Sequence, residues 1–236
     1  MQNAVIVTSV NKEYYDNYGH RLIDSYKTYL KDVFSFHLYN EDFNLHDPNI
    51  KEMNWDLGKN YHDFQSRWKS RPRIQTFAKK AYSIIHALNN IDCDKLIWID
   101  SDCIITSTFT SEVTDQILDD KFLASYFGVY HEEDGKEYFS CETGFFVINK
   151  RHKDFNKFLN MYENIYNNDM HQELRRFYDG EVFGNCMLKL KNENVALQDL
   201  SPIGRGNKRY KTPIRHSVLA PFILHHKGKG LKVYTY

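Results

Sequence analysis

Hydrophobic residues at the start of the chain follow two different periods. An almost continuous apolar run over residues 4–10 is typical of a buried strand. The next apolar residues recur at helical spacing, at Leu22, Ile23, Tyr26, Tyr29 and Leu30. Residues 34–39 alternate between apolar and polar side chains, which predicts a second strand. A strand, a helix and a strand in this order indicate two parallel strands joined by a right-handed crossover.

The rest of the chain continues this alternation of strands and helices. Further strands are expected at 95–105, 121–127 and 143–148, and helices at 72–88, 155–166 and 181–190. A polar loop over 131–134 is expected between two of the strands. The pattern predicts one α/β domain over residues 1–236, with a mainly parallel twisted sheet flanked by helices.

Two segments depart from the pattern. Residues 40–69 are polar and irregular, and we expect an insertion near the site that sets the choice of acceptor. Residues 201–236 contain eight Lys and Arg and no Asp or Glu. Glycines in this segment would let backbone amides approach a phosphate closely, so we expect a basic C-terminal lid. A solvated basic surface is the plainer alternative.

Composition narrows the class of protein. The 31 basic and 31 acidic residues leave no net charge, which argues against broad electrostatic binding to nucleic acid. The four cysteines match neither a zinc motif nor a disulfide framework, so they are interpreted as reduced thiols. No segment predicts a signal peptide or a membrane span. We therefore expect a soluble, cytoplasmic protein.

The candidate chemistry begins at two acidic residues. The strand over 95–105 carries Asp100 and Asp102 where its apolar pattern breaks. Residues two apart in an extended chain share a face, so both carboxylates could bind one divalent cation. Such a cation would neutralise the oxygens of a diphosphate. Paired acids at a strand end are also common as solvated residues. The other motifs of the chain therefore determine whether a metal site is the better interpretation.

Four motifs occur in a fixed order along the chain. They are Val7-Thr8-Ser9, Asp100-Ser101-Asp102, the segment 141–149, and the His- and Gly-rich segment 224–230. In this order they resemble the GT-A nucleotide-sugar glycosyltransferases, and in particular the glycogenin and galactosyltransferase-type family, glycosyltransferase family eight. The likeness spans most of the chain as ordered motifs rather than as close identity. It implies a GT-A fold and transfer of a sugar from a nucleotide diphosphate, expected to be UDP, with retention of configuration.

The resemblance also implies how the metal and the nucleotide are bound. Asp102 and Asp100 match the acidic metal ligands, and the third ligand is His225, which begins a His-x-x-Gly motif; His226 is the second choice. An imidazole beside two carboxylates favours Mn²⁺ over Mg²⁺, because nitrogen ligands suit the transition ion better. The remaining donor contacts implied by the resemblance are Thr8, Ser9, Tyr14 or Tyr15 on the nucleobase, Arg73, Lys79 or Lys80 on the sugar and phosphate, Ser101, Gly144, and Gly228 with Lys229 or Lys232 on the diphosphate.

Three acidic residues are candidates for the catalytic role. Asp179 and Glu181 stand where the family has an Asp-Gln-Asp signature, and they could orient sugar hydroxyls or stabilise charge at the anomeric carbon. Acids are also favoured at a helix start by the helix dipole. Glu142 could contact hydroxyls of the donor or the acceptor. If the enzyme inverts instead, one of these three residues would serve as the base.

The acceptor stays open at this point and could be a glycan, a small molecule or a modified nucleic acid. One alternative keeps the fold and places the basic tail against modified DNA bases or another polymer. A second is a non-catalytic module that binds a nucleotide sugar. A third is a sugar-nucleotide nucleotidyltransferase, which normally opens with a Gly-rich loop that is absent from residues 7–12.

Overall fold

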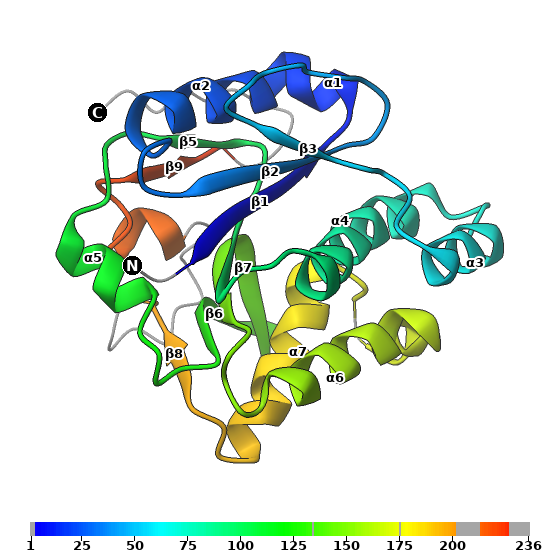
Figure 1. The fold of residues 1–236 in the computed structure, drawn as a ribbon. Helices are drawn as coiled ribbons and strands as arrows, with labels where there is room; N and C mark the ends of the chain where they lie inside the picture. Colours follow the sequence, from blue (N-terminus) through cyan, green and yellow to red (C-terminus); the bar gives the residue numbers. More distant parts are fainter. Residues whose placement is uncertain (1–2, 134, 175, 202–212, 227–236) are drawn as a thin grey trace.

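A seven-stranded sheet forms the centre of the protein (Figure 1). The computed structural model describes residues 3–133, 135–174, 176–201 and 213–226 of the 236. The strands are β1 (Ala4–Val10), β2 (Ser35–Asn40), β3 (Lys51–Met53), β4 (Lys95–Ile99), β6 (Ala124–Glu133), β7 (Lys136–Asn149) and β8 (Leu197–Asp199), in the order β3-β2-β1-β4-β7-β6-β8. The pairs among β3, β2, β1 and β4 are parallel, β7 is antiparallel to both neighbours, and β8 is parallel to β6. The sheet is therefore mainly parallel, which confirms the predicted fold class.

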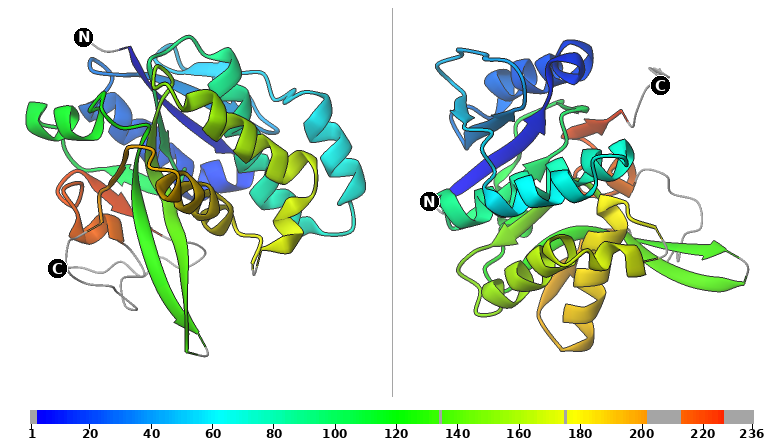
Figure 2. Two further views of the ribbon diagram at one scale, coloured as in Figure 1. Left: turned by 90° about the horizontal axis from the view of Figure 1, so that it is seen from below. Right: turned by 90° about the vertical axis from the view of Figure 1, so that its right-hand side faces the viewer.

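Helices cover both faces of this sheet (Figures 1 and 2). One face packs against α2 (His20–Tyr29) and α5 (Ser111–Ile117), and the other against α3 (Lys59–Arg67), α4 (Pro72–Asn90), α6 (Phe155–Asn167) and α7 (Asp179–Asn192). The apolar run of β1 serves both cores, since Ile6 lies in one cluster and Val7 in the other. Strands covered on both faces are apolar throughout for this reason. None of the helices in the described ranges is long and apolar enough to cross a membrane.

The expected strand 95–105 is two strands. β4 ends at Ile99, residues 100–102 form a turn, and β5 (Cys103–Ile105) leaves the large sheet to pair with β9 (Ile223–His225). The two carboxylates of the Asp-x-Asp motif thus lie in a turn and not in an extended strand. A short helix α1 (Lys12–Tyr14) and a π-helical turn (Tyr15–Gly19) connect β1 to α2, and single 3₁₀ turns occupy Met170–Glu173 and Pro213–His216.

The prediction of a loop at 131–134 is wrong. The strands β6 and β7 continue through this region as a long hairpin, with His131 opposite Tyr138, and Figure 2 shows the hairpin projecting from the body of the protein. Polar residues such as His131 and Glu132 fit a strand here, because this end of the hairpin is exposed. The chain reverses beside Gly135, whose φ of 72° favours glycine.

The segment 40–69 is also more regular than expected. It contains β3 and α3. Two aromatic residues of α3 anchor it, because the rings of Tyr61 and Phe64 lie 5.4 and 5.7 Å from the ring of Tyr82 on α4. The segment is polar because most of its other side chains are exposed.

Candidate functional site

A cavity of about 440 Å³ opens at the carboxyl ends of β1 and β4. This is the edge at which open α/β sheets bind ligands. The sequence-predicted residues that line it are Ser9, Tyr14, Lys79, Lys80, Asp100, Ser101, Asp102 and Asp179. The fold thus gathers side chains from β1, α1, α4, the turn after β4 and the start of α7 around one space, which we call the carboxylate cavity.

Lys80 is the centre of the charge network in this cavity. Its Nζ lies 2.6 Å from Asp100 Oδ1 and 2.7 Å from Asp179 Oδ2, and it also donates to the backbone oxygen of Thr143 at 2.9 Å. Burial alone would lower the pKa of Lys80, but the two carboxylates outweigh it and raise the pKa. The lysine is therefore held as a cation that fixes two acidic side chains from different elements.

Asp100 is oriented by its own strand. The indole Nε1 of Trp98 on β4 donates to Asp100 Oδ1 at 2.7 Å, directly after the end of the strand. The backbone N–H of Asp100 donates to Gly144 on the neighbouring strand β7 at 2.9 Å. Burial raises the pKa of Asp100, and the nearby charges of Asp102 and Asp179 add to that shift against the effect of Lys80. Like charges are crowded here, and a bound cation would relieve this crowding.

Asp179 begins α7 and faces the same cavity. Its Oδ2 accepts a hydrogen bond of 2.6 Å from the hydroxyl of Thr143. Burial would raise the pKa of Asp179, but Lys80 and Thr143 outweigh it and lower the pKa. The next residue, Gly180, lies so close to β7 that a Cβ would meet the backbone oxygen of Cys141 at 2.4 Å. The start of α7 can therefore reach the site only because glycine stands there.

His225 meets the acidic residues from the small sheet. The pairing of β9 with β5 places it opposite Cys103, and its Nε2 lies 3.1 Å from Asp102 Oδ1. Its Nδ1 lies 3.6 Å from Glu142 Oε1. Burial would lower the pKa of His225, but the hydrogen bond with Asp102 and the charge of Glu142 raise it. His226, by contrast, reaches Asp102 through its backbone N–H, at 3.1 Å.

The side chains that could bind a metal ion lie around His225. In the described ranges, Asp102, Cys103 and His225 offer ligand atoms within 4.8 Å of one another. The thiol of Cys103 contacts the backbone oxygen of Gly144 at 3.6 Å, and burial raises its pKa well above the usual value. Since the thiolate is the ligand form of cysteine, the carboxylate and the imidazole are the better pair. Asp100 lies outside this group, and Lys80 and Trp98 bind its Oδ1.

Eight predicted site residues within the described ranges do not line the carboxylate cavity: Thr8, Tyr15, Arg73, Glu142, Gly144, Glu181, His225 and His226. Thr8 is buried in β1, and Tyr15 packs its ring on Phe43 at 4.9 Å. The guanidinium of Arg73 lies over the ring of Tyr178 at 5.2 Å. Glu181 accepts from the backbone N–H of Arg176 at 3.2 Å. Gly144 makes room for the ring of His225, because a Cβ there would lie 2.5 Å from its Cε1.

The lid residues Gly228, Lys229 and Lys232 lie outside the described part of the chain. Glu142, the third predicted catalytic residue, is buried and accepts from the backbone N–H of Gly144 at 3.2 Å. Its side chain therefore supports His225 and does not line the cavity.

Sequence reasoning missed several residues of the cavity. They are Val10, Asn11, Glu41, Thr76, Phe77 and Trp98. Trp98 could have been found, because it stands two residues before Asp100 on the same strand face. Nothing in the sequence near Glu41 indicates that it lines the cavity. Its ion-pair partner, Lys79, is distant in the chain, since Glu41 follows β2 and Lys79 lies in the middle of α4. Burial raises the pKa of Glu41 despite Lys79.

Comparison with known proteins defines the class of the fold. No protein-family profile and no curated protein matches the chain. Several solved structures do match. The bifunctional glycosyltransferase WbbM aligns with a TM-score of 0.57 at 15% identity, over 97% of this chain and 46% of its own. An active-site variant of LgtC aligns with a TM-score of 0.55 at 16% identity, over 95% of this chain and 88% of its own.

Mouse xyloside xylosyltransferase 1 aligns with a TM-score of 0.51 at 10% identity, over 84% of this chain and 85% of its own. All three structures are glycosyltransferases by name, and at these identities the likeness is one of fold. The protein therefore has the GT-A glycosyltransferase fold, as its ordered motifs predicted. The chain spans less than half the length of WbbM and most of the length of the other two.

Proposed function

We propose that the protein is a glycosyltransferase that moves a sugar from a nucleotide diphosphate, with UDP as the nucleotide, to an acceptor. The observation that carries the proposal is the convergence of Lys80, Asp100, Asp102 and Asp179 on one cavity at the carboxyl edge of a GT-A sheet. This arrangement combines acidic groups for a cation with polar groups for a sugar. The fold shared with WbbM and LgtC supports the same function.

Mn²⁺ is the proposed cofactor, with Mg²⁺ as the second choice. Asp102 and His225 would hold the ion, and the second oxygen of Asp100 could join them, because Lys80 and Trp98 bind the first. Oxygen and nitrogen ligands of this kind suit Mn²⁺. When bound, the cation would neutralise charge on the departing diphosphate.

The chain's own residues would bind and orient the donor. The ring of Tyr14 and the hydroxyl of Ser9 line the cavity next to the end of β1, where the nucleobase is proposed to lie. Asp179, held by Lys80 and Thr143, would accept hydrogen bonds from the donor sugar. Because Lys80 fixes the carboxylates of Asp100 and Asp179 before any ligand binds, little reorganisation of these side chains is needed during the reaction. Transfer with retention is proposed, without an obligate enzyme nucleophile.

Release of UDP from a panel of UDP-sugars tests this function. The wild type is expected to hydrolyse one donor slowly with Mn²⁺, more slowly with Mg²⁺, and not at all with chelator. Asp102→Asn should abolish the reaction, whereas Asp115→Asn, the same change on the exposed side of α5, should leave it intact. Metal-dependent binding of a donor without turnover, even with candidate acceptors, would support a non-catalytic module. No binding of any nucleotide sugar would contradict the assignment of the cavity.

A further inference from the structure

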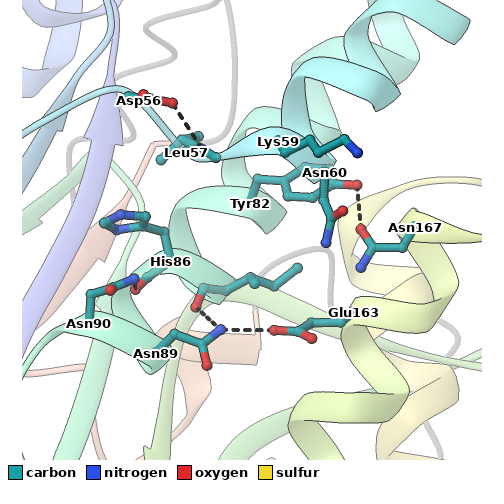
Figure 3. A pocket seen from close by; sticks show the side chains of 12 residues that line it. Asp56, Leu57, Lys59, Asn60, Tyr82, His86, Asn89, Asn90, Glu163 and Asn167 are labelled. Atoms are coloured by element: carbon teal, nitrogen blue, oxygen red, sulfur yellow. Dashed lines mark hydrogen bonds between the residues drawn. The ribbon is translucent and has the colours of Figure 1, made fainter.

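A second cavity, of about 420 Å³, lies between α3, α4 and α6 (Figure 3). Its polar side chains come from the loop before α3 and from all three helices. They include Asp56, Asn60, Asn89, Asn90, Glu163 and Asn167, and we call the cavity the amide pocket. Figure 3 shows Asn60, Asn89, Glu163 and Asn167 directed into the same space.

The amide pocket is separate from the carboxylate cavity, although α4 borders both. Thr76, Phe77 and Lys80 of α4 line the carboxylate cavity, and Tyr82, Ile85, His86 and Asn89 line the amide pocket. Residues three and four apart share a helix face, so each set forms one stripe. Tyr82 lies two positions after Lys80, which turns the second stripe to roughly the opposite side of the helix at about 100° per residue. The helix itself therefore stands between the two cavities.

The hydrogen bonds within the amide pocket leave both donors and acceptors for a ligand. Asn89 donates its amide hydrogens to Glu163, at 2.8 Å, and to the backbone oxygen of Ile85, at 3.1 Å, so among the described residues its own oxygen is left as an acceptor. Asn167 accepts from the hydroxyl of Tyr82 at 2.9 Å through its oxygen, so its amide nitrogen is left as a donor within the described residues. A primary amide offers both kinds of group at one position.

The charges of the amide pocket exclude an anionic ligand. Its ionised side chains are Asp56, Glu163 and Lys59, and burial lowers the pKa of His86, so that imidazole is neutral at neutral pH. One cation against two carboxylates disfavours a phosphate or another acidic group. The buried side chains of Leu57, Tyr82 and Ile85 add apolar surface to the floor. A ligand that matches this lining is therefore not anionic, is rich in groups that both donate and accept hydrogen bonds, and is apolar on part of its surface.

We propose that the amide pocket is a second saccharide-binding site, which holds an uncharged sugar unit of a glycan away from the carboxylate cavity. Sugar hydroxyls donate and accept hydrogen bonds as amides do, and the C–H face of a sugar ring matches the apolar floor. One wall of the pocket, from Asp56 to Asn60, belongs to the segment 40–69. The site does not depend on the proposed transferase activity, because binding of a free saccharide is measured without a nucleotide.

The test follows the side-chain amide signals of the isotope-labelled protein by NMR while uncharged disaccharides are added. Lactose, maltose, cellobiose and mannobiose are each titrated to about 10 mM, a range in which weak binding is measured. At least one is expected to shift the amide signals of Asn60, Asn89 and Asn167. Asn60→Ala and Asn89→Ala, both at exposed positions, should weaken that binding about tenfold. Asn192→Ala, the same change at an exposed position of α7, should not alter it.

Three results would overturn the proposal. In the first, no disaccharide shifts the pocket signals. In the second, UDP with Mn²⁺ displaces the saccharide, which would place the binding in the carboxylate cavity. In the third, the signals respond only to Ca²⁺ or Mg²⁺ and lose that response in Glu163→Gln, which would make the pocket a cation site. An uncharged saccharide should still bind to Glu163→Gln, because glutamine keeps a carbonyl acceptor at that position.

Discussion

The two cavities that border α4 are built on opposite physical principles. In the carboxylate cavity, Lys80 is 13% exposed and is fixed between two carboxylates of other elements. In the amide pocket, Asn60 and Asn89 are exposed, and the charges are few. A buried charge network must be complete to be tolerated, because each unpaired charge in it is costly. The first cavity is therefore part of the fold's stability, whereas the second can be altered without loss of the fold.

The two cavities should differ most in stability when one lysine of each is replaced. Lys80→Met leaves the half-buried carboxylates of Asp100 and Asp179 without their shared cation, and should lower the free energy of unfolding by about 3 kcal/mol. Lys59→Met, at an exposed position of the amide pocket, should change it by less than about 0.5 kcal/mol. Urea unfolding at pH 7, with equal m values in the two variants, measures both.

A second variant separates lost charge balance from lost packing. Lys80→Met combined with Asp179→Asn removes one of the orphaned charges, so it should recover part of the stability. If Lys80→Met is as stable as the wild type, the ion pairs of Lys80 contribute nothing to the free energy of unfolding. The proposed difference between the two cavities would then be wrong.

Each cavity also has one glycine whose replacement by alanine should have a different cost. Gly144→Ala places a Cβ 2.5 Å from the ring of His225, a ring that Asp102 and Glu142 hold on either side, and should cost about 2 kcal/mol. Gly58→Ala in the amide pocket meets no atom within 4 Å, and should cost about 1 kcal/mol through its φ of 88° alone.

Thermal unfolding of both glycine variants gives the size of each effect, and donor hydrolysis gives the second readout. Gly144→Ala should also reduce UDP release, because it displaces a proposed metal ligand, whereas Gly58→Ala should not. Loss of activity in Gly58→Ala alone would reverse the assignment of the two cavities.

The sequence was sufficient for the fold and for most side chains of the carboxylate cavity. Apolar runs and helical spacing are local signals, so β1, α2, α4, α6 and α7 were predicted close to their observed bounds. The break at Asp100 was predicted as well, but not the turn of β5 into a second sheet, which depends on pairing with β9 more than a hundred residues away. Local patterns carry no information about such a partner.

The same limit explains which site contacts could not be predicted. The ion pairs of Lys80 join α4 to the turn after β4 and to the start of α7, so nothing near Lys80 in the sequence distinguishes it from its neighbour Lys79. The amide pocket carried no signal at all, because Asn60, Asn89 and Asn167 are far apart in the chain and each is typical of a solvated helix surface. Only the packing of three helices brings them together.

Nucleotide binding should distinguish the two cavities with a smaller effect. Tyr14 lines the carboxylate cavity, so Tyr14→Ala removes the proposed stacking surface and should weaken UDP binding about tenfold. Tyr15→Ala, whose ring packs on Phe43, and Asn60→Ala in the amide pocket should leave UDP affinity within about twofold. Calorimetric titration with UDP and Mn²⁺ measures the three variants. Equal weakening by Tyr14→Ala and Tyr15→Ala would remove the evidence for stacking at Tyr14.

His86, which lines the amide pocket, should make the stability of the protein weakly dependent on pH. A hydrogen bond of 2.8 Å joins His86 Nδ1 to the hydroxyl of Tyr39, and burial lowers the pKa of His86 below its usual value of 6.5, against the weaker opposite effect of Asp56. The unfolded chain therefore binds a proton more readily than the folded one as the pH falls below about 6.5, so the stability held above that pH is lost there.

His86→Gln should keep a side chain that can bond to Tyr39 and should flatten this part of the stability curve. His62→Gln is the matched control, because His62 is exposed on α3 and pairs with Asp56 at the surface, where an ion pair contributes little. Urea unfolding between pH 7 and pH 5 gives the comparison. A slope that is unchanged in His86→Gln would show that this imidazole takes up its proton in the folded protein as easily as in the unfolded chain, and that the floor of the amide pocket is wetter than its packing indicates.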